Sequence, residues 1–178
     1  MSNVLAAPGP YYTDQFLHDD NMGLIDETVA EVYGMMLGLE TAVAREASSG
    51  KASTGESHTA IVGLSGALRG SCEVRMDSMA ARMVTSAMLG NPLGNPLVGE
   101  HDASIGDAVG EICNMIAGGW KNRIPSLASA CSLSPPTIVY GCNYVVKLGT
   151  PCIKFVRVYE FGGQAMQVTL QCEELPRG

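Results

Sequence analysis

The chain has 178 residues, of which 46% are hydrophobic, 6% aromatic and 16% charged, and its formal net charge at pH 7 is -7. The length predicts one domain, and a chain this rich in apolar residues is not intrinsically disordered. Residues 1–44 carry seven carboxylates and no Lys or Arg, whereas the remainder holds eleven acidic and eleven basic residues. Because nucleic-acid binding requires a concentrated basic surface, we exclude that class of function.

The sequence contains no signal for membrane insertion or secretion. No apolar run approaches the roughly 18 residues that a membrane helix needs. Residues 1–10 lack the positively charged start of a secretory signal. We therefore expect a cytoplasmic protein that makes no contact with a membrane.

The six cysteines contain no Cys-x-x-Cys pair, and the three histidines are scattered along the chain. Most of the cysteines lie in apolar segments, which indicates small buried side chains. Disulfides are disfavoured in a cytosolic domain, and a zinc site needs clustered thiolates or imidazoles. We expect neither in this protein.

The first half of the chain predicts a tail, two helices and a hairpin. Residues 1–20 mix Pro, Gly, Asp and Tyr, as in a flexible acidic tail, and residues 21–178 form the single domain. The expected elements, in chain order, are a helix from Leu24 to about Glu46, strands over Thr59–Leu68 and Ser71–Met76, and a helix over Ser78–Leu89.

The second half predicts one long helix followed by strands. The helix runs from about Ser104 to Ile124, with Ser104 as its N-cap and Asp107 in its first turn. The strands form an antiparallel meander over Thr137–Leu148, Cys152–Phe161 and Gln164–Cys172. This order of elements predicts an α+β fold, in which two long helices pack on one face of a mostly antiparallel sheet.

The long helix carries two different faces. At about 100° per residue, one arc is apolar and comprises Ile105, Val109, Ile112, Cys113, Ile116 and Trp120. The opposite strip consists of Asp107, Glu111, Asn114 and Gly118. An ordinary solvated face would mix Lys with Glu. Two carboxylates, an amide and a glycine favour a surface that a partner approaches closely, with an incidental exposed face as the alternative.

The first helix repeats this spacing at an offset of 80 residues, with Glu27, Glu31, Gly34 and Gly38 on one side. Each helix is followed by a Gly/Ser/Pro-rich link and then by a similar strand, Ala60–Gly63 in one half and Ile138–Gly141 in the other. We infer an internal duplication with pseudo-two-fold symmetry. Only the second helix has Asn in the third place, so Glu27, Glu31 and Gly34 are interpreted as a degenerate second site.

The pattern Asp107-x-x-x-Glu111-x-x-Asn114-x-x-x-Gly118 resembles the signature of the CheC/CheX/FliY superfamily of chemotaxis phosphatases. The surrounding residues 110–118 are similar to the CheX branch in particular, and the single helix with Asn favours the same branch. The resemblance extends over roughly residues 22–175.

The resemblance implies a phosphatase that hydrolyses the phosphoaspartate of a CheY-like response-regulator receiver domain. Asn114 would orient the attacking water, and Glu111 would dock the receiver by pairing with its active-site lysine. Asp107 would support this docking from the edge of the contact surface, and Gly118 would permit close approach of the receiver to the helix. The enzyme would need no cofactor of its own, because the expected Mg²⁺ belongs to the receiver. By analogy, the protein would form a homodimer through sheet edges.

Two other functions stay open at this point. A non-catalytic adaptor or switch-type domain of the same superfamily would bind a receiver or a flagellar partner, although it has no reason to retain both Glu111 and Asn114. A self-standing hydrolase would use Asp107 and Glu111 as paired carboxylates. Those two side chains lie on a convex surface with no predicted cleft, so a small substrate would be poorly enclosed.

Overall fold

The computed structural model describes residues 19–44, 55–91, 98–99, 102–147 and 152–173. Residues 1–18 of the expected tail lie outside this range, and residues 19–20 already belong to the first helix.

One antiparallel sheet runs through the described residues, in the strand order β1-β6-β7-β3-β2-β4, and β5 pairs with the same outer edge of β2 as β4 does. The strands are β1 (Ala42–Val43), β2 (Ser57–Gly66), β3 (Gly70–Asp77), β4 (Cys131–Leu133), β5 (Thr137–Gly141), β6 (Cys152–Phe161) and β7 (Gln164–Glu173). β2 and β3 are consecutive and antiparallel, which confirms the predicted hairpin.

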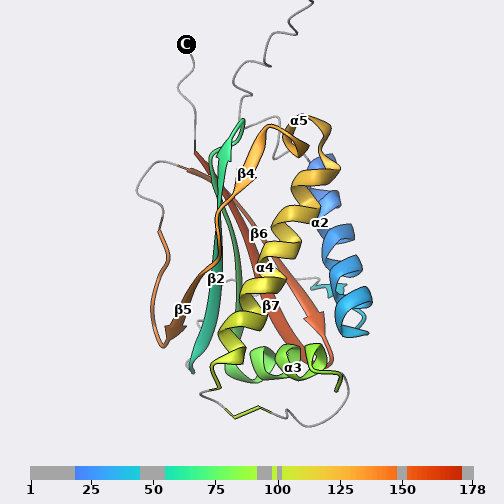
Figure 1. The fold of residues 1–178 in the computed structure, drawn as a ribbon, viewed down its shortest axis with the longest axis vertical. Coiled ribbons are helices and arrows are strands. Elements are labelled where there is room, and N and C mark those ends of the chain that lie inside the picture. The colour runs from blue at the N-terminus through green and yellow to red at the C-terminus, as the bar shows by residue number, and fades with distance from the viewer. Residues whose placement is uncertain (1–18, 45–54, 92–97, 100–101, 148–151, 174–178) are drawn as a thin grey trace, which may run out of the picture.

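The helices cover one face of this sheet (Figure 1). α2 (Asp19–Val32) and α4 (Ser104–Arg123) lie side by side and antiparallel, while α3 (Ser78–Met88) crosses one end of the sheet. The short α5 (Pro125–Ala128) follows α4. The α+β architecture with helices on one face is confirmed, with α3 as a further member of the helical layer. No helix in the described ranges has the length and apolar character that a membrane span requires.

The core lies between the helical layer and the sheet. All six residues of the predicted apolar arc of α4 are fully buried. They pack on β2 and β3, where alternate residues face the helices, as in Ala60, Val62 and Leu64 of β2. Burial of this arc determines which side of α4 remains available to solvent.

The first helix differs from its predicted range of Leu24–Glu46. α2 begins at Asp19, and after Val32 the chain continues as a π-helical segment, η1 (Tyr33–Leu37). The helix ends there because Gly38 adopts a left-handed conformation, with φ of 63°, and its N–H donates to the carbonyl of Tyr33. The predicted helix was therefore wrong beyond Leu37, and β1 follows instead.

The predicted C-terminal meander was wrong in its first strand, whereas β6 and β7 form the predicted antiparallel pair. β5 covers only Thr137–Gly141 and pairs with β2, on the opposite side of the sheet from β6. The strand ends early because the backbone turns at Asn143, which has a positive φ of 54°. β4 and α5 were not predicted at all, since a three-residue strand and a single helical turn are too short to show periodicity.

The topology carries the inferred duplication in a modified form. One unit is α2-β1-β2-β3 and the other is α4-β5-β6-β7, and exchanging them maps the order β1-β6-β7-β3-β2-β5 onto itself. The counterpart of β2 is therefore β6. The equivalence assigned to Ala60–Gly63 and Ile138–Gly141 was wrong, because these segments belong to directly paired strands, with Ala60 opposite Ile138.

Candidate functional site

The N-terminus of α4 is fixed by Asp102 and not by the predicted cap, Ser104. One carboxylate oxygen of Asp102 accepts hydrogen bonds from the backbone N–H of Ser104 at 2.9 Å and from its hydroxyl at 2.6 Å. These two bonds hold the pKa of Asp102 below its ordinary value, the hydroxyl having the larger effect. Ser104 is itself the first helical residue. The N-cap residue is Ala103, which makes no side-chain capping bond, so the hydrogen bonds at this helix start come from Asp102.

The side of α4 that points away from the sheet carries the predicted strip, called the α4 strip below, of Asp107, Glu111, Asn114 and Gly118. Asp107 and Glu111 are exposed, and Asn114 and Gly118 are partly exposed. In the described part of the chain, the side chains of Asp107, Glu111 and Asn114 make no ion pair or hydrogen bond. The strip thus presents two carboxylates and one amide, available to a partner, on a rigid helix.

Small residues bring β4 and β5 close to one flank of the strip. A Cβ atom at Gly110 would lie 3.1 Å from Cδ1 of Ile138 and 3.2 Å from Cγ of Pro136. A Cβ atom at Gly106 would lie 3.6 Å from Cγ2 of Ile138, and one at Gly118 would lie 3.7 Å from Cδ1 of Leu133. The glycines at 106 and 110 therefore let the edge strand pack directly against the helix backbone.

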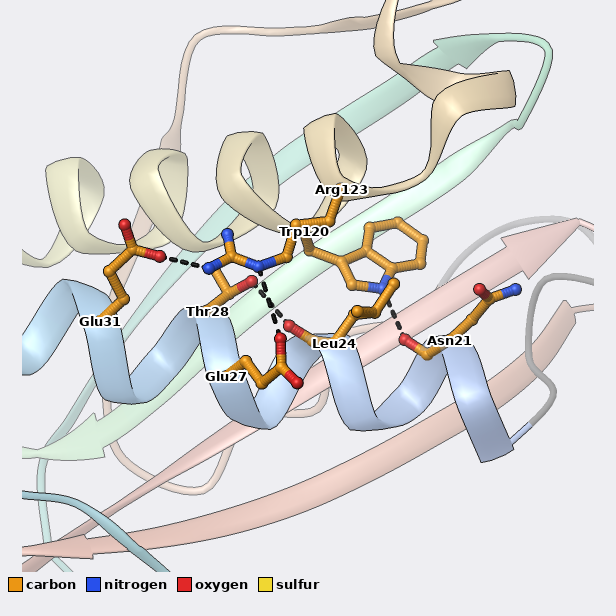
Figure 2. A network of polar contacts seen from close by, with 7 residues as sticks. All are labelled: Asn21, Leu24, Glu27, Thr28, Glu31, Trp120 and Arg123. Carbon is orange, nitrogen blue, oxygen red and sulfur yellow. Dashed lines mark hydrogen bonds and ion pairs between the residues drawn. The ribbon is translucent and has the colours of Figure 1, made fainter.

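The other flank is held by α2. A Cβ atom at Gly119 would lie only 2.6 Å from Cγ2 of Thr28, so the two helices approach each other closely at this point. The indole N–H of Trp120 donates to the carbonyl of Asn21 at 3.1 Å (Figure 2). Trp120 is fully buried, as expected, and it ties the end of α4 to the start of α2.

The corresponding acidic pair on α2, Glu27 and Glu31, already has a cation of the same chain as its partner. The guanidinium of Arg123 lies between Glu27 and Glu31 (Figure 2), with Nη2 paired to Glu31 and Nε 3.9 Å from the carboxylate of Glu27. Arg123 lies in the last turn of α4. Its partners are residues 92 and 96 positions earlier in the chain, which helical spacing cannot reveal.

The third position of the α2 pattern also departs from the α4 strip. Gly34 has no side chain and lies in η1, where π-helical geometry replaces the α-helix. The regular spacing that brings Glu111 and Asn114 together is therefore lost after Glu31. These observations describe a second acidic face without an amide, in which two carboxylates share one guanidinium.

Sequence patterns did not reveal two large exposed side chains of β5, of which Ile138 lies against α4 beside the α4 strip. Ile138 and Tyr140 are 38% and 42% exposed despite their size. The alternation Ile-Val-Tyr predicted a strand, but it contained no signal that this strand would lie beside α4.

Other features of the described residues lie away from this strip. A hollow of about 750 Å³ lies at the β6–β7 turn, where Glu40, Asp77 and Glu160 contribute carboxylates. The described residues include no group of three or more His, Cys, Asp or Glu side chains placed to hold a metal ion. The polar groups that the α4 strip presents to solvent are therefore carboxylates and an amide.

Comparisons with known proteins agree on one family. The family model described as "Chemotaxis phosphatase CheX" matches residues 58–156. A protein named CheY-P phosphatase CheX, from Thermotoga maritima, is 29% identical over 126 residues, which is 71% of this chain and 76% of that protein.

Solved structures show the same fold. A chemotaxis protein CheX from Desulfovibrio desulfuricans superposes with a TM-score of 0.69 at 20% identity, covering 86% of this chain and 99% of that one. A CheX from Borrelia burgdorferi, solved in complex with CheY, BeF3 and Mg²⁺, gives a TM-score of 0.61 at 22% identity, with 87% and 99% covered.

Substitution of the two adjacent glycines, Gly118 and Gly119, should change the free energy of unfolding in opposite directions. Gly119→Ala should lower the free energy of unfolding by about 1–3 kcal/mol, because its methyl group would displace Thr28. Thr28 cannot rotate freely, since it is buried and its hydroxyl donates to the carbonyl of Leu24 at 2.7 Å. Gly118→Ala should instead raise stability by up to about 1 kcal/mol, because alanine favours the helix and meets only an ordinary contact. Urea unfolding measures both, and equal shifts of the same sign would contradict this packing.

Proposed function

The chain belongs to the CheX family of chemotaxis phosphatases, and from this premise we propose that it hydrolyses the phosphoaspartate of a CheY-like receiver domain. The Thermotoga maritima relative carries the name of such a phosphatase. The Borrelia burgdorferi structure of the same fold contains CheY beside CheX. Both support a receiver as the partner of this chain.

The observation that carries the proposal is the exposed pair of Glu111 and Asn114. They lie three residues apart on one face of α4, and no side chain in the described residues engages either of them. A convex surface cannot enclose a small substrate, but it can enter the concave active site of another protein. This favours a protein substrate over the self-standing hydrolase with paired Asp107 and Glu111.

The reaction requires little from the phosphatase beyond positioning. Water attacks phosphorus in line with the bond to the aspartyl oxygen, and that bond breaks with its electron pair on the receiver carboxylate. The hydroxyl and the remaining proton of the water end on the released phosphate. The carboxylate is a good leaving group, and Mg²⁺ held by the receiver would balance charge on the phosphoryl oxygens. The chain itself supplies no cofactor in this scheme.

Asn114 would orient the water. Its carbonyl oxygen accepts a hydrogen bond from the water while its NH₂ group donates to a neighbouring oxygen, and neither function depends on protonation. An amide fixed on a packed helix holds the water without losing freedom at the moment of reaction.

Glu111 would fix the docking geometry. No cation among the described residues pairs with its carboxylate, which could therefore pair with the active-site lysine of the receiver. Asp107 would add negative charge at the edge of the contact surface. Gly118 has no side chain and would therefore allow the receiver to come close to the helix. Glu27 and Glu31 would not form an equivalent site, because Arg123 pairs with both and Gly34 supplies no amide.

An adaptor that binds a receiver without hydrolysis remains the alternative. Such a protein would use Glu111 for docking and would gain nothing from Asn114.

A cytoplasmic location follows from the nature of the proposed partner. We also propose the homodimer through sheet edges, for which β1 is a candidate, since it ends the strand order in the described residues and exposes Ala42 and Val43. Light scattering during size exclusion should give twice the chain mass of 18.7 kDa; the monomer mass would exclude the dimer.

Replacement of Asn114 tests the catalytic role. Asn114→Ala should reduce the acceleration of phosphoreceiver decay by about 100-fold or more, because one positioning hydrogen-bond partner is lost. Affinity for the receiver loaded with beryllofluoride, a phosphoryl mimic, should stay within about threefold, since the amide orients water and does not dock. Decay of a labelled phosphoreceiver and titration calorimetry measure the two quantities.

Asn122→Ala is the matched control, because Asn122 is an exposed amide about two turns further along α4. It should leave both quantities unchanged. Full activity of Asn114→Ala would identify the chain as an adaptor or assign hydrolysis to another residue.

Replacement of Glu111 tests docking. Glu111→Gln should raise KM for the phosphoreceiver by about two- to fivefold, the factor expected for loss of an exposed ion pair of up to ~1 kcal/mol. The salt dependence of KM should also weaken. Glu31→Gln, its counterpart on α2, should leave KM unchanged because Arg123 already engages that carboxylate. Steady-state kinetics at two salt concentrations measure this, and the role fails if Glu31→Gln and Glu111→Gln behave alike.

A further inference from the structure

We propose that Tyr140, together with Ile138, forms an apolar ledge beside the α4 strip that anchors the receiver and determines which receivers bind. This inference rests on the proposed function and adds a contact surface to the same site. It concerns affinity and selection of the partner, and it assigns neither residue a part in the hydrolysis.

The ledge is continuous with the α4 strip. Ile138 lies against the helix backbone at Gly106 and Gly110. Gly106 directly precedes Asp107, and Gly110 directly precedes Glu111. Tyr140 is two residues further along the same strand and therefore faces the same side of the sheet. A partner surface large enough to reach Glu111 and Asn114 would extend over these two side chains.

The exposure of the ledge is unusual for its composition. Ile138 and Tyr140 retain 38% and 42% exposure, although β5 is an edge strand whose helix-facing side chains could have been covered. Adjacent exposed apolar side chains next to a strip of unengaged polar groups are the arrangement of a binding site, in which apolar anchors sit beside orienting polar contacts.

Tyr140 is held in one orientation before any partner arrives. Its hydroxyl donates to the carboxylate of Glu56. Its ring lies 4.6 Å from the ring of His58, centroid to centroid, at an angle of 34°, and the two residues are direct cross-strand neighbours. An aromatic side chain already fixed in this way loses little conformational entropy on binding.

His58 provides an uncharged support for that ring. It is 5% exposed, and its Nε2 has no hydrogen-bond partner in the described residues. Burial lowers the pKa of His58 despite the opposing carboxylate of Glu56, so the imidazole is neutral near pH 7. The ring of Tyr140 is therefore supported by an uncharged group, and 42% of Tyr140 is exposed.

The occupant is a receiver domain because the ledge adjoins the groups that would enter a receiver's active site. The receiver surface around that site would have to place an apolar patch next to its lysine, so that the lysine meets Glu111 while the patch meets Tyr140. Receivers with a charged side chain at that place would bind poorly, because the charge would be desolvated without a partner.

The test is the effect of ledge substitutions on KM and kcat for phosphoreceiver decay. Tyr140→Ala should raise KM by about tenfold or more while kcat at saturation stays within about twofold, because an anchor contributes equally to substrate and transition state. Tyr140→Phe should raise KM by a smaller factor than Tyr140→Ala, since it keeps the ring and its contact with His58 but loses the hydrogen bond to Glu56. Ile138→Ala should raise KM by a smaller factor.

Val145→Ala is the matched control, because Val145 is a 76% exposed apolar residue beyond the end of β5; it should change neither parameter. Unchanged KM in Tyr140→Ala and Ile138→Ala would overturn the proposal, as would a loss confined to kcat. A change in the mass of the isolated chain without a change in KM would assign the ledge to self-association and would also overturn it. Failure of the wild-type protein to accelerate any receiver's decay would instead refute the proposed function, so the two failures are distinct.

Discussion

The close packing of α4 on both flanks is the constraint on which the rest of the structure depends. On one side Gly119 leaves just enough room for Thr28 of α2, and on the other Gly110 does the same for Pro136 and Ile138. With the apolar arc buried against the sheet, the helix can neither rotate nor shift without a steric conflict. Glycines inside a helix cost stability, and here they serve to fix a helix whose outer strip must meet another protein in one orientation.

The two acidic helices illustrate how one fold can carry one site instead of two. Both have carboxylates at equivalent positions, but the pair on α2 shares the guanidinium of Arg123, whereas Glu111 on α4 has no cation within the described residues. The switch to π-helical geometry at Tyr33 removes the regular spacing after Glu31. The difference therefore lies in two local features, an internal cation and a change of helix type, and not in the arrangement of the layers.

The sequence predicted what depends on local periodicity and missed what depends on distant contacts. The buried arc of α4 and the shared face of Glu111 and Asn114 follow from a 3.6-residue repeat, which needs no knowledge of the neighbours. The end of α2 was misplaced because apolar spacing continues past Gly38, while the backbone of that glycine stops the helix. The position of β5 was misassigned because alternation is the same whichever strand is the neighbour. For the same reason the ledge of Ile138 and Tyr140, and the pairing of Arg123, could be found only in three dimensions.

The central claim is that a receiver docks on the exposed strip of α4 and the adjoining edge strand. Backbone amide resonances of the isotope-labelled chain, followed during titration with the beryllofluoride-loaded receiver, test it most directly. We predict that the perturbed resonances concentrate in residues 106–118 and 137–141. Perturbations concentrated on the outer side of α2, or on the sheet face opposite the helices, would contradict it.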